Sequence, residues 1–157
     1  MSKIETINPA TAEKIADYET MSEAEAIEAV EACHAAFLDW REKSHEDRGA
    51  VLKAIAKELR ENTGELSQVM TREMGKLLKD GKDEIELCAQ IFEYTAEHGP
   101  GQLKDETRDL GDGNKGLVTY QPIGVVYSIQ PWNFPMYQPV RVLAAEGCDV
   151  IAPRRQG

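Results

Sequence analysis

The sequence has few cysteines and histidines, and none of them stands in a metal-binding or disulfide pattern. There are three of each, and both sets are scattered along the chain. Zinc ligands and disulfide frameworks need close or paired spacings, which are absent here. We therefore expect reduced thiols and no metal site. The residues concerned are Cys33, Cys88, Cys148, His34, His45 and His98.

The chain also lacks an excess of positive charge and a long apolar run. Its 28 acidic and 18 basic residues give a formal net charge of −10, which offers no electrostatic footprint for nucleic acid or an anionic membrane. The longest apolar stretch, GVVYSI at 124–129, is far shorter than the roughly 20 residues of a membrane helix. The start, MSKIETINPAT, has no apolar signal core. These absences predict a soluble, cytoplasmic protein without nucleic-acid or membrane partners.

What is present is enough apolar material for one ordinary globular core. The 157 residues are 41% hydrophobic, which suits a single domain and is too little for two large ones. Residues 4–18 place Asn8-Pro9 between two short alternating runs, so we expect an extended or hairpin start that acts as a cover strand.

Capping signals and apolar spacing predict four helices after this start. Two begin at Ser22 and Ser44, each with an acidic residue three positions later. A third ends at Gly75 in a left-handed conformation, with Lys76 beside the negative end of the helix dipole. The fourth, 83–98, is apolar all round and should bury Cys88 as a core residue; glycine and proline at 99–101 should stop it. The expected apolar positions of the first two helices are Ile27, Val30, Phe37, Leu38, Val51, Leu52, Ile55, Ala56 and Leu59.

The pattern changes after the fourth helix. The polar, glycine-bearing segment 104–116 predicts a loop and a domain boundary. Residues 117–121 alternate like a half-exposed strand that Pro122 ends. Residues 124–129 are apolar at nearly every position, which is typical of a parallel strand covered on both faces. Such a strand needs neighbours, and only 149–152 offers another candidate.

The stretch QPWNFP, at 130–135, follows this predicted strand directly. Pro135 suits a first helical position, and Phe134, which precedes a proline, favours an extended conformation. Asn133 is thereby placed at the carboxyl end of a parallel strand, where open α/β sheets bind ligands. Spacing alone leaves two interpretations open. Either Asn133 acts on a ligand, or it only caps the helix while Trp132 fills core.

Four segments resemble the aldehyde dehydrogenase superfamily in the right order: TINPAT, HAAFLDWRE, TREMGK and YQPIGVVYSIQPWNFP. The resemblance covers residues 5–143, and PWNFP after a P-x-G-V strand is its most specific part. It implies an α/β fold that is mostly helical at first and then enters a Rossmann-like NAD(P) domain. The expected divisions are a helical segment with a cover strand at 1–103, a loop with an oligomerisation-type strand at 104–123, and the truncated start of the cofactor domain at 124–157.

The family mechanism implies a role for the asparagine. In that family a cysteine thiolate attacks the aldehyde, an asparagine amide and a backbone N–H hold the oxyanion, hydride passes to the nicotinamide, and a glutamate activates water. By motif position Asn133 is similar to that asparagine, whose work demands a fixed donor. The same comparison places Ile129, Trp132 and Asn133 along the wall that binds NAD or NADP.

Arg141 resembles the arginine that binds the distal carboxylate of the substrate in succinate-semialdehyde dehydrogenases. It lies eight residues after Asn133, about two helical turns, so the two could face the same side. A solvated surface arginine is the alternative, and Pro139 would favour it by turning Arg141 away.

The resemblance is incomplete, because the GQxC nucleophile motif and the ELGG glutamate motif of the family do not occur in these 157 residues. The tail also ends in arginines where the family has a ribose-binding lysine, so NAD and NADP stay open. We therefore expect an N-terminal fragment of an NAD(P)-dependent aldehyde dehydrogenase of the succinate-semialdehyde type. Its full-length form would oxidise a small aldehyde, and the fragment would be inactive alone, since activity would need an unforeseen nucleophile. The alternative is a non-catalytic helical module that forms homo-oligomers, or pairs with a full-length subunit, through an exposed strand edge.

Overall fold

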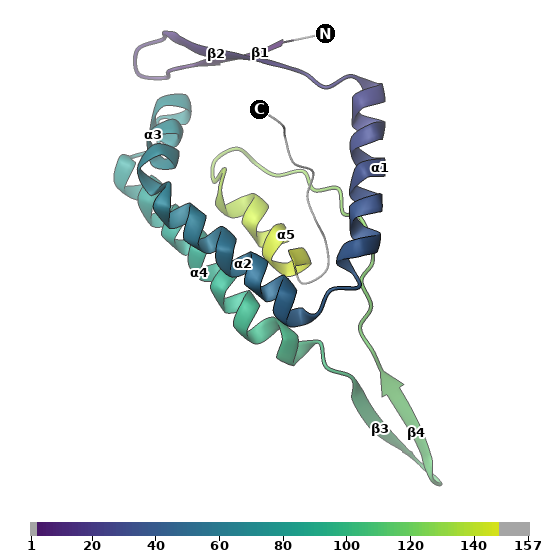
Figure 1. The fold of residues 1–157 in the computed structure, drawn as a ribbon. Coiled ribbons are helices and arrows are strands. Elements are labelled where there is room, and N and C mark those ends of the chain that lie inside the picture. The colour runs from purple at the N-terminus through teal and green to yellow at the C-terminus, as the bar shows by residue number, and fades with distance from the viewer. Residues whose placement is uncertain (1–2, 148–157) are drawn as a thin grey trace.

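The computed structural model describes residues 3–147, which form a mixed helix and strand architecture of the α/β class (Figure 1). Helices α2, α4 and α5 pack together, and the β3–β4 hairpin projects away from them. In chain order the elements are β1 (Lys3–Ile7), β2 (Lys14–Glu19), α1 (Glu23–Trp40), α2 (His45–Glu61), α3 (Thr63–Met74), α4 (Leu78–Gln102), β3 (Glu106–Gly111), β4 (Asn114–Val118) and α5 (Tyr137–Gly147). No helix in this range is long and apolar enough to cross a membrane.

One apolar core lies between α2, α3, α4 and α5. It forms because each helix presents apolar side chains at spacings of three and four residues. Cys88 is fully buried in it, and this burial raises the pKa of the thiol to about 12. Cys88 is therefore a packed core residue, as predicted. The core side chains are Leu52, Ala56, Leu59, Met70, Ile85, Cys88, Ala89, Phe92, Val140 and Ala144.

The local signals of the first half are confirmed. The start of the chain is an antiparallel hairpin of β1 and β2. Ser22 and Glu25 form a reciprocal capping box at α1, and Ser44 Oγ accepts the Asp47 N–H at 3.1 Å at the start of α2. Gly75 ends α3 with φ +74°. These features depend on a few neighbouring residues, which explains why they can be read locally.

The predicted apolar faces of α1 and α2 are only partly buried. Phe37, Leu52, Ala56 and Leu59 are covered, but five other predicted positions are exposed. Periodicity identifies an apolar face without supplying its neighbour, and Figure 1 shows α1 standing apart from the bundle of α2, α4 and α5. The exposed positions are Ile27, Val30, Leu38, Val51 and Ile55.

Helix α4 is longer than predicted, and the stop signal at 99–101 is wrong. The helix runs from Leu78 to Gln102 with Pro100 inside it. Proline removes the hydrogen bond to the Ala96 carbonyl, and its ring crowds that carbonyl. At that turn α4 packs tightly on α2, since a Cβ added to Gly49 would lie 3.3 Å from the Ala96 oxygen. This packing holds the turn in place.

Residues 104–116 contain most of a hairpin and are not a loop. β3 and β4 are antiparallel, joined by a turn at 111–113 in which all three residues have positive φ. The strand expected at 117–121 therefore begins at Asn114 and ends at Val118. The polar composition hid the first strand because almost all of its side chains are exposed to solvent.

The predicted strand at 124–129 does not form. This segment has no regular secondary structure, and Tyr127 and Ile129 are 87% and 81% exposed. A parallel strand needs hydrogen-bonded neighbours, and the strands of residues 3–147 pair only within their two hairpins. The other strand candidate, 149–152, lies outside the described residues, as does Cys148.

Candidate functional site

The QPWNFP stretch forms a turn before α5, which begins at Tyr137. Pro135 is therefore not its first helical residue, contrary to the prediction. Asn133 is exposed, and Trp132 is 76% exposed, so the interpretation of Trp132 as a core side chain is wrong. Without the neighbouring strand that would place it in a sheet, the turn owes its position to contacts with α4 and with the start of α5.

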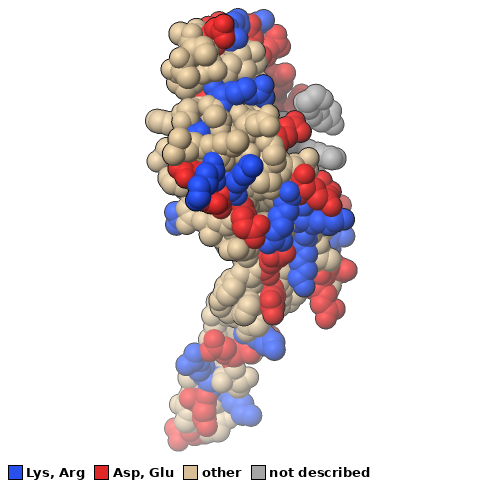
Figure 2. Space-filling model, turned by 90° about the vertical axis from the view of Figure 1, so that its left-hand side faces the viewer, with Lys and Arg blue, Asp and Glu red and all other residues tan. Residues whose placement is uncertain are grey.

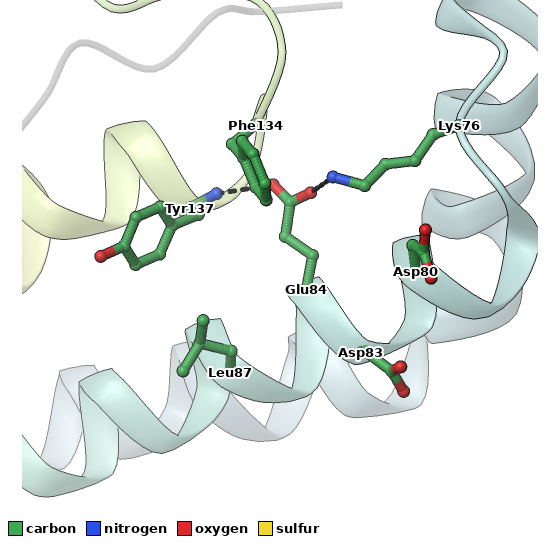
Figure 3. A pocket seen from close by; sticks show the side chains of 7 residues that line it. All are labelled: Lys76, Asp80, Asp83, Glu84, Leu87, Phe134 and Tyr137. Atoms are coloured by element: carbon green, nitrogen blue, oxygen red, sulfur yellow. Dashed lines mark hydrogen bonds and ion pairs between the residues drawn. The ribbon is translucent and has the colours of Figure 1, made fainter.

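A remote carboxylate, and not Asn133, caps the start of α5. Glu84 of α4 is only 4% exposed, and its Oε1 accepts the main-chain N–H groups of Met136 and Tyr137, each at 2.9 Å. Figure 3 shows this carboxylate pointing at the first turn of α5. The first N–H groups of a helix have no partner within the helix, and a negative charge also suits the helix dipole there. Glu84 satisfies both conditions.

Lys76 completes this arrangement. Its ammonium pairs with Glu84 Oε2 and lies 4.0 Å from the ring centroid of Phe134, where a cation–π contact is favourable. The Lys76 side chain is only 10% exposed. The sequence-based explanation of Lys76 as a partner of the α3 dipole therefore missed its main contacts. A buried carboxylate needs such a partner, because an unpaired charge in the interior is costly.

Two cavities adjoin the turn that carries Asn133, and Asn133 itself lines neither of them. The first, of about 370 Å³, lies over Glu84 and Lys76 and includes Phe134 (Figure 3). The second, of about 520 Å³, lies between β1, α3 and the turn and includes Trp132. The residues on either side of Asn133 thus line different cavities. The first cavity is formed by Lys76, Asp80, Asp83, Glu84, Leu87, Phe134 and Tyr137.

Arg141 lies in α5, and its guanidinium carbon is 5.8 Å from the ring centroid of Tyr137. Because α5 begins at Tyr137, Asn133 stands in the turn and the argument from two helical turns does not hold. Pro139 leaves α5 continuous, because it stands in the first turn of the helix, where proline is tolerated. Ile129 is exposed in the segment before the turn.

Charges of both signs are interleaved on the molecular surface. Figure 2 shows basic and acidic side chains side by side over the bundle and along the projecting hairpin. No group of three or more histidine, cysteine, aspartate or glutamate side chains within the described part of the chain is arranged to hold a metal ion. The candidate site therefore consists of the exposed turn, its two cavities and the buried pair that anchors it.

Comparison with protein families shows to which family the chain belongs. The model of the aldehyde dehydrogenase family matches residues 1–152. The chain belongs to the aldehyde dehydrogenase family. The family that the sequence resemblance implied is thereby confirmed.

Curated relatives carry a more specific name. The chain is 36% identical over 139 residues to a succinate-semialdehyde dehydrogenase [NADP(+)] of Deinococcus radiodurans, covering 88% of this chain and 29% of that protein. It is 35% identical over 147 residues to the succinate semialdehyde dehydrogenase [NAD(P)+] Sad of Escherichia coli, covering 90% of this chain and 32% of that protein. The chain therefore spans about a third of the length of these relatives.

Solved structures agree in fold. Succinate-semialdehyde dehydrogenase from Burkholderia pseudomallei matches with a TM-score of 0.88 and 33% identity over 94% of this chain and 31% of that one. Succinic semialdehyde dehydrogenase from Streptococcus pyogenes in complex with NADP+ matches with a TM-score of 0.85 and 31% identity. The match covers 92% of this chain and 32% of that one. The α/β prediction is thereby confirmed.

Sequence reasoning missed Glu84 and its bond to α5. Glu84 was hidden within a helix that was already apolar on all sides. A signal was present, however, because Glu84 precedes the core residue Cys88 by four positions and so shares its helical face. An acidic side chain on a buried face must find partners, and Lys76 of TREMGK is the residue that pairs with it.

Proposed function

We propose that this chain supplies the oxyanion-binding part of an NAD(P)-dependent aldehyde dehydrogenase that oxidises succinate semialdehyde to its acid. The observation that carries the proposal is the 35–36% identity to succinate-semialdehyde dehydrogenases over about nine-tenths of the chain. The anchored PWNFP turn supports it, because a group that binds a developing negative charge must be fixed before the charge appears.

In this proposal the Asn133 side-chain amide donates a hydrogen bond to the oxyanion formed from the aldehyde. The donor suits an oxyanion because its N–H groups carry no charge that would need to be neutralised in the resting state. Its exposed position lets substrate approach it from solvent. A donor of this kind contributes about 3–4 kcal/mol to the stabilisation of the transition state.

Exposed apolar surface beside the asparagine fits a cofactor. Ile129 and Trp132 are 81% and 76% exposed, and an indole ring offers a broad surface to the flat rings of a dinucleotide. In this proposal both residues line the cofactor wall together with the main chain of Asn133. NAD(P), when bound there, would supply the hydride acceptor for the oxidation.

Arg141 would select a substrate that carries a second carboxylate. Its guanidinium is exposed and lies over the Tyr137 ring, which restricts its motion without consuming its N–H donors. A planar guanidinium pairs with a carboxylate through two parallel hydrogen bonds. This role favours succinate semialdehyde over an uncharged aldehyde of similar length.

The chain contains no GQxC or ELGG motif, so we expect no turnover from these 157 residues alone. A chimera tests the function directly. Residues 1–147 would replace the aligned segment of the Escherichia coli relative, and NADP reduction would be followed with succinate semialdehyde and with butanal. Turnover with preference for the carboxylate substrate is expected. A folded, cofactor-binding chimera that oxidises neither aldehyde would contradict the proposal.

Assembly with other chains is a second function that one observation favours. Ile123, Tyr127 and Ile129 are each more than four-fifths exposed along a segment without secondary structure. Apolar backbone that is not paired in a sheet can add to a strand of another chain. Pairing with a second copy, or with a longer family member, would cover this surface.

A further inference from the structure

Glu84 has a complete set of partners for a buried carboxylate. Its Oε1 accepts the N–H groups of Met136 and Tyr137 at 2.9 Å, and its Oε2 pairs with Lys76. The side chain of Glu84 is 2% exposed. A charge so deeply buried persists only when hydrogen bonds and an opposite charge offset the lost hydration. The partners come from three places in the chain: the segment after α3, the turn before α5, and α5 itself.

The capping of α5 differs from that of α1 and α2. α1 and α2 are capped by the serine directly before them, Ser22 and Ser44. Helices usually use such a local cap because it needs no tertiary structure. α5 instead depends on a carboxylate more than 50 positions earlier. This remote cap fixes the position of the turn relative to α4, which a local cap would not do.

The remote cap also affects Asn133. Asparagine is among the residues that most often cap a helix, and a capping asparagine directs its side chain toward the helix start. Here Glu84 already accepts the N–H groups of Met136 and Tyr137. The Asn133 side chain is therefore not needed to cap α5.

Lys76 provides a second link to the residue that follows Asn133. Its ammonium lies 4.0 Å from the centroid of the Phe134 ring while it neutralises Glu84. The position of Lys76 depends on Gly75, which ends α3 with a φ of +74°. Gly75 also packs closely against Pro9, since a Cβ added to Gly75 would lie 3.2 Å from the proline ring. The backbone at this junction therefore favours glycine.

We propose that Glu84 and Lys76 are positioning residues for Asn133: together they hold the turn 130–136 so that the asparagine amide keeps one orientation without capping α5. This role rests on the proposed function of Asn133. Neither residue touches the substrate in this account. Their effect is transmitted through the N–H groups of Met136 and Tyr137 and through the Phe134 ring.

Hydrogen exchange of the whole 157-residue chain, followed by NMR, tests this role without relying on turnover. In Glu84→Ala the amides of Met136 and Tyr137 should exchange roughly 10- to 100-fold faster, the effect of losing a hydrogen bond to a charged acceptor. The side-chain amide signal of Asn133 should shift. Glu84→Gln should restore most of the protection, because its carbonyl oxygen still accepts both N–H groups.

Two further variants separate positioning from general stability. Asp80→Asn, which removes an exposed charge from the same cavity, should leave these amides and the Asn133 signal unchanged. If Glu84→Ala does not fold, Lys76→Met combined with Glu84→Gln provides the test, since it removes both charges and keeps the acceptor. In that double variant the Met136 and Tyr137 amides should stay protected, while the Asn133 signal should shift relative to Glu84→Gln because the Phe134 ring has lost its contact with the ammonium. An unchanged Asn133 signal would overturn the role of Lys76. Unchanged protection in folded Glu84→Ala, or an equal loss throughout the α2 and α4 core in Glu84→Gln, would overturn it.

Because the readout is amide exchange, this result is independent of whether Asn133 acts in catalysis. A turn that loosens in Glu84→Ala, combined with an Asn133 substitution that leaves turnover unchanged, would refute the proposed function and leave the anchoring intact. Unchanged protection in Glu84→Ala, combined with an Asn133 substitution that abolishes turnover, would refute the anchoring and leave the proposed function intact.

Discussion

Glu84 and Tyr137 are 53 positions apart in sequence, yet the Glu84 carboxylate accepts the Tyr137 main-chain N–H at 2.9 Å. This bond connects α4 to the first residue of α5, which directly follows the turn that carries Asn133. It explains how an exposed turn without a neighbouring strand still has a defined position. It also makes the site depend on packing within the helical part of the chain.

Cys88 should be chemically inert in the folded chain. Burial raises the pKa of its thiol to about 12, and the thiolate is the reactive form. We expect modification of Cys88 by a thiol reagent at pH 7 to be at least about a hundred-fold slower than in the chain unfolded by guanidinium. Mass spectrometry of the Cys88 peptide measures this rate. Equally fast modification in both states would show that the thiol is accessible, and would reopen the case for a nucleophile.

Arg60 should make stability depend on pH in the acid range. Its guanidinium contacts Glu93 at 2.6 Å and Glu86 at 2.9 Å, and these hydrogen bonds lower the pKa of both carboxyls. A lowered folded-state pKa stabilises the protein above the unfolded value, about 4.3, and this contribution is lost as pH falls through the folded value. Because the groups are partly exposed, the effect should be modest.

Urea unfolding from pH 7 to pH 3 measures this contribution. In Arg60→Met the urea midpoint of unfolding should fall less steeply with decreasing pH below about pH 5 than in the parent chain. Lys57→Met, which removes an exposed lysine of the same helix, should leave the pH profile as in the parent chain. Parallel pH profiles for Arg60→Met and the parent chain would show that the ion pairs of Arg60 with Glu86 and Glu93 contribute nothing to stability.

The exposed segment before the turn should promote self-association. Tyr127 and Ile129 are 87% and 81% exposed, and unpaired extended backbone favours pairing with another chain. Sedimentation velocity should show a concentration-dependent oligomer that Tyr127→Lys with Ile129→Lys weakens. Lysine in place of the exposed Ile27 of α1 is the matched control. A strictly monomeric parent chain would argue against assembly through this segment.

Local signals in the sequence were sufficient for the starts of α1 and α2 and for the end of α3. The capping box at Ser22 and the left-handed Gly75 depend on neighbouring residues only, and both are present in the structure. The stop predicted at Pro100 failed because packing on Gly49 outweighs the loss of one helix hydrogen bond. The hairpin at 106–118 was hidden because its polar side chains show no apolar alternation.

The candidate site was predictable only in part. The PWNFP motif identified Asn133 and Trp132, and the family comparison confirms the family to which they point. The strand at 124–129 was wrong because strands form with partners, and no described strand pairs with it. Glu84 was missed because its role depends on a contact with α5 that no local pattern contains.

The turnover number of the chimera with Asn133→Ala tests the central claim most directly. Removal of one oxyanion donor should lower kcat about 10²- to 10³-fold, with cofactor binding and the unfolding midpoint retained. Gln138→Ala, which removes another amide two residues into α5, should retain the parent rate. A kcat for Asn133→Ala within about twofold of the parent chimera would contradict the assignment of Asn133 to the oxyanion.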